Sequence, residues 1–378
     1  MSEWHIIACE YPPQIGGVSS YVACIARALS EAGDLVHVWC PPADGSRPQA
    51  NGVTVHEELG QFRPSDLRNA GRKLDAFPAP RRLLVQWVPH GYGYRSMNLP
   101  FCLWVRQRAR RGDLVDIMVH EPFLAFTGTW RQKAAAAVHR VMTVVLLGVV
   151  RNAWISIPAW RQMLEPFARG RHLEFQWLPI PSPIEPIVDP TGVASIRARY
   201  APPGGHVVGH FGMYPRLTAR PMKEIVSPML AQLHGISILL MGQGSGTLRD
   251  EIVSAEPQLE GRVHASGPLT NQELSRHLQA CDVLVQPYPE GISARRTSTM
   301  ASLVHGKAVV TSEGPASESL WREHGAVSLV PSNAAAIVAE VERLVGDSCA
   351  RVQLGERGRR LYDGFFAVRH TVDVLIAS

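Results

Sequence analysis

A series of short apolar runs, separated by segments long enough for helices, constrains the fold of this chain more than any other feature of its sequence. An apolar run at residues 4–9 is followed by a loop with two adjacent glycines and by a stretch with helical spacing at 18–32. The other runs of this half lie at 35–40, 83–88, 114–119 and 153–157. Parallel strands need long crossover connections, which the intervening segments supply. The first half is therefore predicted to be a doubly wound α/β domain.

The same pattern starts again after a proline-rich segment at residues 178–190. Its five prolines cannot join a regular helix, so it is predicted to link two domains. The apolar runs beyond it lie at 206–211, 236–241, 262–266, 281–287 and 307–312. Pro221 is expected in a first helical turn, and Thr270 with Glu273 is expected to form a capping box. We predict an α/β fold of two Rossmann-like domains, at 1–182 and 183–355, with a terminal segment at 356–378.

Length and composition exclude several classes of protein. A chain of 378 residues is too long for one ordinary core and fits two domains. Its six cysteines lack the C-x-x-C spacing of metal or redox sites, so reduced thiols and a cytoplasmic location are expected. The amino terminus lacks the layout of a secretory signal. The apolar stretch at 134–150, which His139 and Arg140 interrupt, is predicted to be a buried helix rather than a membrane span.

Basic residues concentrate in region 61–111, where 11 Lys and Arg accompany only Asp66 and Asp75. One interpretation is a solvated face. The other is a surface that meets anionic lipid or a phosphate-bearing substrate, with peripheral contact at the inner face of a membrane. Nucleic acid is not an expected partner, because the basic excess is modest and no nucleic-acid motif accompanies it.

In doubly wound sheets ligands bind beyond the carboxyl ends of the strands, so the loops there supply the candidate residues. Gly16 and Gly17 precede a helix and let an anionic group approach its positive end, although a tight turn without a ligand is as common. His120 ends an apolar strand and is either structural or part of a site. Arg216 and Arg220 follow another strand and either clamp a phosphate or lie on the surface.

The loop at 242–246, GQGSG, raises a further hypothesis, a nicotinamide-dependent oxidoreductase. Its spacing is G-x-G-x-G, whereas dinucleotide binding typically uses G-x-G-x-x-G. The sequence has no Asp-x-Asp pair and no paired-cysteine motif. No cofactor and no metal are therefore expected, and a phosphate site would rely on side chains and helix termini.

Together, several segments resemble the retaining family 4 glycosyltransferases of GT-B fold. The segments are GGV at 16–18, VHE at 119–121, FG with Arg216 and Arg220, LLMGQGSGTLRDEI at 239–252, RVHASGPLTNQEL at 262–274, and the stretch from CDVLVQPYPEGIS to MASLVHGKAVVTSEG within 281–314. The likeness covers nearly the whole second domain and, more loosely, the first. It implies two domains that face each other across a cleft, with the nucleotide-sugar donor on the second and the acceptor on the first. It also implies that the last helix crosses back to the first domain.

The resemblance implies roles for single residues. The catalytic residues would be His120, beside the transferred sugar, and Glu290, on its hydroxyls. The donor-binding residues would be Gly16, Gly17, Arg216, Arg220, Gly291, Ile292, Ser293, Arg295 and Ser298. Within this set, the glycines at 16–17 would lie against the donor phosphates or the acceptor, and Arg216 or Arg220 would bind the pyrophosphate. The backbone amides of 291–293 would hold the sugar hydroxyls.

One position departs from the family pattern. A second glutamate is expected eight residues after Glu290, where it would bind the nucleotide ribose, and this chain has Ser298 there. Replacing a charged hydrogen bond by a neutral one costs about 1–2 kcal/mol, roughly 10- to 30-fold in donor affinity. Arg295 and Arg296 stand beside the start of the next helix, and since adjacent residues project about 100° apart, one of them is expected to face the diphosphate.

The acceptor side is expected at Tyr92, Tyr94 and Arg95, because aromatic residues beside arginines suit a lipid headgroup or a lipid diphosphate. The alternative there is a core strand followed by an amphipathic helix. The leading hypothesis for function is a retaining, hexosyltransferase-type enzyme that moves a sugar from a nucleotide-sugar donor to a glycan or lipid-linked acceptor, in cell-surface polysaccharide or glycolipid synthesis. The alternative is a non-catalytic GT-B protein that senses or scaffolds a nucleotide sugar.

Overall fold

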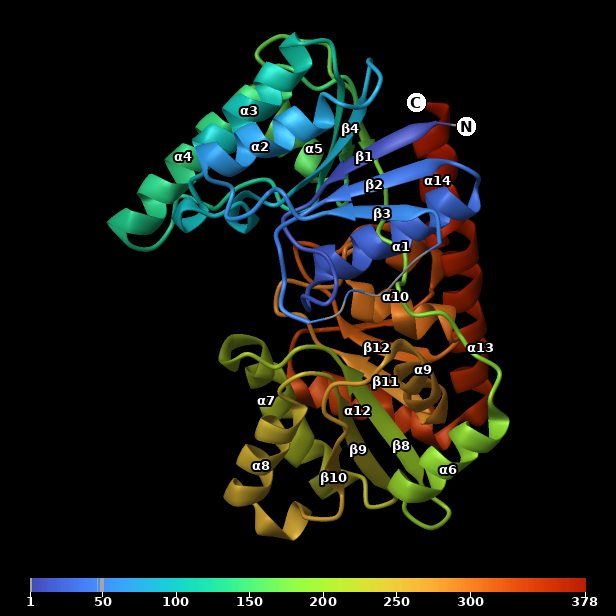
Figure 1. Ribbon diagram of the computed structural model, residues 1–378. Helices are drawn as coiled ribbons and strands as arrows, with labels where there is room; N and C mark the ends of the chain where they lie inside the picture. The colour runs from blue at the N-terminus through green and yellow to red at the C-terminus, as the bar shows by residue number, and fades with distance from the viewer. Residues whose placement is uncertain (1, 46, 48–50) are drawn as a thin grey trace. The chain divides into compact units, whose positions relative to one another are not determined.

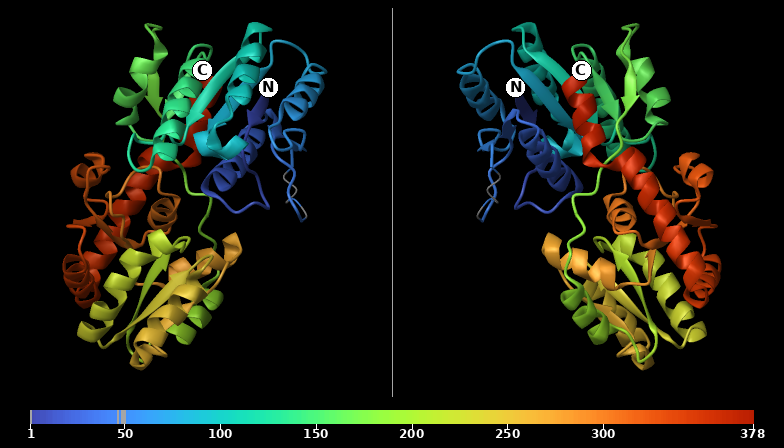
Figure 2. Two further views of the ribbon diagram at one scale, coloured as in Figure 1. Left: turned by 90° about the vertical axis from the view of Figure 1, so that its left-hand side faces the viewer. Right: turned by 90° about the vertical axis from the view of Figure 1, so that its right-hand side faces the viewer.

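The computed structural model describes residues 2–45, 47 and 51–378, apart from the side chains of 216–218. The chain divides into two compact units. Unit 1 comprises Met1–Pro181 and Val368–Ser378, and unit 2 comprises Ser182–Ala367. Each unit contains a parallel β-sheet with helices on both of its faces (Figures 1 and 2). The predicted α/β class, with two doubly wound sheets, is confirmed.

In unit 1 the described strands lie in the order β3-β2-β1-β4-β5-β6-β7. The strands are β1 (Glu3–Ile7), β2 (Leu35–Trp39), β3 (Val53–His56), β4 (Arg82–Trp87), β5 (Leu114–Val119), β6 (Ala153–Ile155) and β7 (Phe175–Trp177). The α-helices are α1 (Gly17–Glu31), α2 (Pro64–Leu74), α3 (Leu99–Arg110), α4 (Trp130–Leu147), α5 (Trp160–Leu164) and α14 (Val368–Ala377). All paired strands are parallel, so their carboxyl ends meet at one edge.

The core of unit 1 lies on both faces of its sheet, because alternate strand residues point in opposite directions. In β4, Leu83 and Val85 pack on the face that α2, α3 and α4 cover. Leu84 packs on the opposite face with residues of α1 and α14. The terminal helix α14 is held there by Leu375, whose side chain is buried and whose carbonyl accepts a hydrogen bond from Arg82 at 2.9 Å.

In unit 2 the described strands lie in the order β10-β9-β8-β11-β12-β13, again all parallel. The strands are β8 (His206–Phe211), β9 (Ile236–Met241), β10 (Val263–Ala265), β11 (Val283–Gln286), β12 (Ala308–Ser312) and β13 (Ser328–Val330). The α-helices are α6 (Pro190–Tyr200), α7 (Arg216–Gln232), α8 (Ser245–Ala255), α9 (Asn271–Ala280), α10 (Thr297–Val304), α11 (Leu320–His324), α12 (Ala334–Gly346) and α13 (Ser348–Leu361). The predicted capping box of Thr270 and Glu273 starts α9.

Three local predictions need correction. Pro221 lies inside α7 rather than in its first turn, because the helix already begins at Arg216. The apolar stretch at 134–150 is not a fully buried helix, since α4 buries one face and leaves Val141 51% exposed. The terminal segment is not one helix from residue 356, because a π-helical turn at Tyr362–Phe366 separates α13 from α14.

Candidate active site

The segment 287–296 connects β11 to α10 and carries the predicted sugar-binding glutamate. Glu290 forms an ion pair with Arg296, and Nη2 of Arg295 lies 3.9 Å from the same carboxylate oxygen. The Arg296 guanidinium also lies over the ring of Tyr288, 4.5 Å from its centroid. The two adjacent arginines are therefore directed at one carboxylate, rather than at different sides of the helix.

Gly291 allows the backbone conformation of this segment. Its φ of +92° suits glycine, and a Cβ there would lie 2.5 Å from a backbone nitrogen of the facing loop. The Gly291 N–H donates to the carbonyl of residue 288 at 2.9 Å, and the Ile292 N–H donates to Ser312 O at 3.0 Å. The Ile292 side chain is fully buried. Both amides are thus engaged within the protein, which corrects the prediction that they face sugar hydroxyls.

A partly buried carboxyl group that the sequence did not reveal holds the same segment by hydrogen bonds. Glu318, between β12 and α11, accepts hydrogen bonds from the Ala294 N–H at 3.0 Å and from the Trp321 indole N–H at 2.7 Å. Burial raises the pKa of Glu318, against the effect of these two hydrogen bonds. The hydroxyl of neighbouring Ser293 is buried and has no hydrogen-bond partner among the described residues. The one signal in the sequence for Glu318 is its position after an apolar strand.

Ser298 lies in the first turn of α10, at the position where a ribose-binding glutamate was expected. Its hydroxyl is 2.8 Å from the Tyr288 hydroxyl, which also lies 3.0 Å from Thr299 Oγ1. Tyr288 Oη donates weakly to Gln286 Oε1 as well, at 3.3 Å. A small network of neutral hydroxyls and one amide therefore stands where the family pattern has a carboxylate.

The two arginines after β8 belong to α7 itself and not to a loop. The side chain of Arg216 lies outside the described residues. Arg220 has an 80% exposed side chain, and its Nε donates to Glu224 at 2.7 Å, one helical turn further on. Its proposed role at a pyrophosphate would require this exposed ion pair to open, which costs little in water.

The glycines of the 242–246 loop have structural roles. Gly242 has a φ of +113°, and a Cβ there would lie 2.2 Å from the carbonyl oxygen of Gly212. Gly244 has a φ of +84° and precedes the first turn of α8. The Ser245 hydroxyl accepts a hydrogen bond from the Gly267 N–H at 3.0 Å. The backbone angles and close contacts explain why glycine occupies positions 242 and 244, and no bound dinucleotide is needed to explain them.

His120, in unit 1, is a buried residue at the carboxyl end of β5. Its Nε2 donates to Oε1 of Gln86 at 2.8 Å, and its ring meets the Tyr21 ring edge to face, with centroids 4.7 Å apart. Burial lowers the pKa of His120 to about 3. The imidazole is therefore neutral at physiological pH, with its proton on Nε2, and it cannot act as a cationic acid.

A carboxylate of the chain itself occupies the start of α1. Glu10 Oε1 accepts a hydrogen bond from the Ser19 N–H at 2.8 Å. A Cβ at Gly16 would lie 2.1 Å from this oxygen, whereas one at Gly17 would meet nothing within 4 Å. Because a second anion would be repelled by Glu10, the predicted contact of Gly16 with a donor phosphate is not available in this arrangement. Gly16 instead makes room for the carboxylate.

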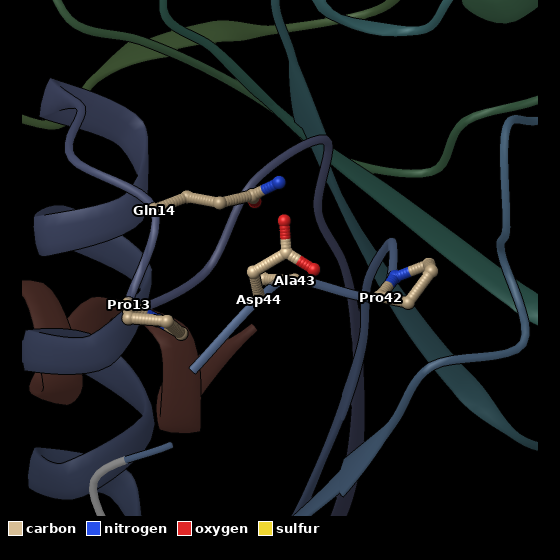
Figure 3. A pocket seen from close by; sticks show the side chains of 5 residues that line it. All are labelled: Pro13, Gln14, Pro42, Ala43 and Asp44. Carbon is tan, nitrogen blue, oxygen red and sulfur yellow. The ribbon is translucent and has the colours of Figure 1, made fainter. Parts of the chain in front are cut away.

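A pocket of about 380 Å³ lies beside this loop, at the carboxyl ends of β1 and β2. It is lined by Pro13, Gln14, Pro42, Ala43 and Asp44. Figure 3 shows the amide of Gln14 and the carboxylate of Asp44 directed toward each other across the pocket. These two residues were not among the sequence candidates. A hydrophilic pair between prolines can bind hydroxyl groups.

The three predicted acceptor-side residues fall into two groups. Tyr92 is fully buried, stacks on Phe101 with centroids 4.0 Å apart and donates to Gln86 O at 2.5 Å, so it is a core residue and cannot contact an acceptor. Tyr94 and Arg95 are exposed, and both have positive φ, 48° and 51°. A left-handed backbone is unfavourable for such residues, and strain of this kind clusters at functional sites.

A neutral histidine holds this left-handed turn. His139 Nε2 donates to Ser96 O at 2.7 Å, and its Nδ1 accepts weakly from the Leu124 N–H at 3.4 Å. Burial lowers the pKa of His139.

In the described part of the chain no group of three or more His, Cys, Asp or Glu is arranged to hold a metal ion. The helices described there include none that is both long and apolar enough to cross a membrane.

Two successive doubly wound sheets, with these loops at their carboxyl edges, define a GT-B fold. Solved structures of that class cover the chain almost completely. Sucrose-phosphate synthase from Thermosynechococcus elongatus has a TM-score of 0.75 at 17% identity and covers 100% of both chains. HepE of Anabaena, in complex with UDP-glucose, has a TM-score of 0.68 at 15% identity, over 99% of this chain and 98% of HepE. WaaG, a glycosyltransferase involved in lipopolysaccharide biosynthesis, has a TM-score of 0.65 at 15% identity, over 98% and 99%.

The family itself is indicated by sequence. Residues 206–347, which lie within unit 2, match the family described as glycosyl transferases group 1. A search of curated protein sequences found no match. The resemblance inferred from the motifs is confirmed for the fold and for this domain.

Proposed function

We propose that the protein is a retaining glycosyltransferase that moves a hexose from a nucleotide-sugar donor to a glycan or lipid-linked acceptor. The observation that carries the proposal is the meeting of Glu290 with Arg295 and Arg296 after β11, within the segment that matches the group 1 family. A carboxylate accepts hydrogen bonds from sugar hydroxyls, and guanidinium groups match phosphate oxygens. The presence of both kinds of group on one short segment supports the proposal.

The chemistry requires charge separation. When the bond from the anomeric carbon to the diphosphate breaks, negative charge builds on the leaving group and positive charge on the sugar ring. In the proposed mechanism Arg295 and Arg296 bind and stabilise the diphosphate. The diphosphate replaces Glu290 as the partner of Arg296, and Glu290 then binds the sugar. The acceptor attacks from the face that the diphosphate leaves, and the leaving phosphate takes the acceptor's proton. His120 serves as a neutral hydrogen-bonding group beside the sugar.

We further propose that the acceptor is bound by unit 1, near Tyr94, Arg95 and the pocket of Gln14 and Asp44, and that the protein works at the inner face of a membrane.

The proposed membrane contact is made by exposed apolar side chains that lie beside arginines. Trp130, which starts α4, is 74% exposed. The loop before it carries Phe126, which is 53% exposed. The centroid of the Phe126 ring lies 3.9 Å from Cζ of Arg140. Such pairs suit an anionic lipid interface. Cell-surface polysaccharide or glycolipid synthesis is the process that fits this placement.

The test is a transfer assay with purified full-length protein. UDP-glucose is the first donor to try, because HepE was solved with it and the E. coli trehalose-6-phosphate structure holds UDP-2-fluoro glucose. We expect slow release of nucleoside diphosphate with a suitable sugar nucleotide and faster release with acceptor. The anomeric configuration of the product, read by NMR, tests retention. An inverted product would refute retention, and absence of transfer from every common sugar nucleotide would refute the enzyme.

A non-catalytic sugar-nucleotide sensor is the second candidate, and Ser298 favours it because the ribose-binding carboxylate is missing. Tight binding of a sugar nucleotide, without turnover across a broad acceptor panel, would support the sensor against the enzyme. The oxidoreductase hypothesis predicts quenching of protein fluorescence by a nicotinamide dinucleotide, which we do not expect.

A further inference from the structure

A second cavity in unit 1, of about 540 Å³, lies between α2 and α3, which run side by side (Figure 1). We call it the arginine groove. It is lined by Ser65, Arg68, Gly71, Arg72 and Asp75 of the α2 segment and by Trp104, Gln107, Arg108 and Arg111 of the α3 segment. The positions 68, 71, 72 and 75 have helical spacing, and so do 104, 107, 108 and 111. Each helix thus presents one continuous face to the groove.

The charges in the groove are strongly unbalanced. Four arginines and a single aspartate line it. Asp75 is already engaged, because Arg108 Nη1 donates to it at 2.6 Å and Arg111 Nη1 lies 3.4 Å from its other oxygen. Arg68 and Arg72, both exposed, have no acidic partner within 4 Å in the described parts of the chain. Like charges one helical turn apart destabilise a helix, so an anion between them would relieve this repulsion.

The floor of the groove is built from buried groups that are held by ion pairs. Arg108 is 1% exposed, and its Nε donates to Asp113 at 2.6 Å. Asp113 in turn accepts from Arg81 Nη1 at 2.9 Å. Gly71 lies against the indole of Trp104, since a Cβ at residue 71 would be 3.2 Å from Trp104 Nε1. The missing side chain keeps the centre of the groove open, and the buried ion pairs fix the position of one guanidinium.

We propose that the arginine groove binds a phosphate-bearing ligand with at least two negative charges. Guanidinium forks match phosphate oxygens in geometry and charge, and the cavity is larger than a single phosphate needs. The ligand is either an anionic lipid headgroup or a soluble phosphorylated compound. The groove lies along the helices that cover one face of the sheet, so it is distinct from the loops at the carboxyl edge where the candidate active-site residues lie. It contains four of the eleven basic residues of the region at 61–111.

The experiment uses the full chain with UDP present at saturation to occupy the donor site, and two probes. Pyrophosphate is titrated by isothermal calorimetry. Vesicles of phosphatidylcholine, with and without phosphatidylglycerol, are tested by co-sedimentation. The groove variants are Arg68→Gln/Arg72→Gln and Gln107→Glu, which change exposed residues. The control is Arg322→Gln/Arg360→Gln, which removes the same charge from exposed sites in unit 2.

We expect the wild type and the control to bind at least one probe equally well, and both groove variants to lose at least about tenfold in affinity for it. Binding of the phosphatidylglycerol vesicles alone identifies a lipid headgroup, and binding of pyrophosphate alone identifies a soluble ligand. Failure of both probes, or equal loss in the control, overturns the proposal. Transfer to a water-soluble acceptor should be unchanged in the groove variants, so the outcome is independent of the proposed enzyme.

Discussion

The Ser298 hydroxyl lies 2.8 Å from the Tyr288 hydroxyl, in a neutral network at the point where a ribose-binding carboxylate was expected. We predict that Ser298→Glu increases donor affinity by roughly 10- to 30-fold, because a charged acceptor contributes about 1–2 kcal/mol more than a neutral one. Calorimetric titration of the sugar nucleotide measures this. Ser298→Ala is the control, for which a small loss is expected. Equal affinity of the wild type and Ser298→Glu would show that the ribose does not reach this position.

Glu290 is predicted to matter for turnover and not for folding. Its ion pair with Arg296 is partly exposed, and such pairs contribute about 0–1 kcal/mol to stability. Glu290→Gln should therefore leave the urea unfolding midpoint nearly unchanged while it lowers kcat about 100-fold, as expected when a preorganised group is lost. Glu356→Gln, which removes an exposed carboxylate near Arg360, is the matched control. A Glu290→Gln enzyme with normal kcat would remove this residue from the catalytic machinery.

Glu318 is predicted to control the stability of the 287–296 segment in a pH-dependent way. Burial raises its pKa in the folded state, so the folded protein binds this proton more tightly than the unfolded chain does. Its contribution to the free energy of unfolding is fully present below the unfolded pKa and is lost as pH rises through the folded pKa. Urea unfolding at several pH values should show this slope in the wild type and not in Glu318→Gln. An identical slope in both proteins would exclude Glu318 as its source.

Glu318→Ala is expected to do more damage than the glutamine variant. It leaves the Ala294 N–H and the Trp321 indole N–H without their acceptor, at a cost of about 2–4 kcal/mol. Thermal unfolding of the two variants side by side tests the ranking. A glutamine variant less stable than the alanine variant would contradict the proposed hydrogen bonds.

His120 is predicted to make unit 1 sensitive to acid. Burial lowers its pKa from an ordinary value of 6.5 to about 3, so its stabilising effect is complete above pH 6.5 and is lost as pH falls toward 3. His120→Gln should flatten the loss of stability over that interval. His5, also in unit 1, whose pKa burial likewise lowers to about 3, should account for part of the remaining slope. An unaltered pH profile for His120→Gln would mean that the imidazole is not neutral in the folded state.

Turnover is predicted to persist when divalent metals are removed with EDTA. The reason is that the proposed diphosphate site uses Arg295 and Arg296 as its cations. The measurement compares initial rates of diphosphate release before and after chelation, with restoration by added Mg²⁺ as the control. Complete loss on chelation, reversed by Mg²⁺, would overturn the metal-free proposal.

Some features of the fold and site were predictable because their signals are local. The apolar runs that became β1, β2, β4 and β5, and the capping box of Thr270 and Glu273, are encoded within a few neighbouring residues. Helix boundaries were less predictable. Arg216 and Arg220 were expected in a loop, yet α7 extends through Pro221 because packing of the whole helix outweighs one missing hydrogen bond.

By itself, the sequence determined two parallel α/β sheets, a loop with Glu290 beside two arginines, and a basic region at 61–111, since periodicity and composition are properties of the chain alone. Only the tertiary structure decided which groups meet. It placed Glu10 at the start of α1, Glu318 on the amide of Ala294 and Tyr92 in the core, and it joined α2 and α3 into the arginine groove. Partners of this kind lie on separate elements, so no spacing in the sequence specifies them. The packing of helices on the sheets brings them together.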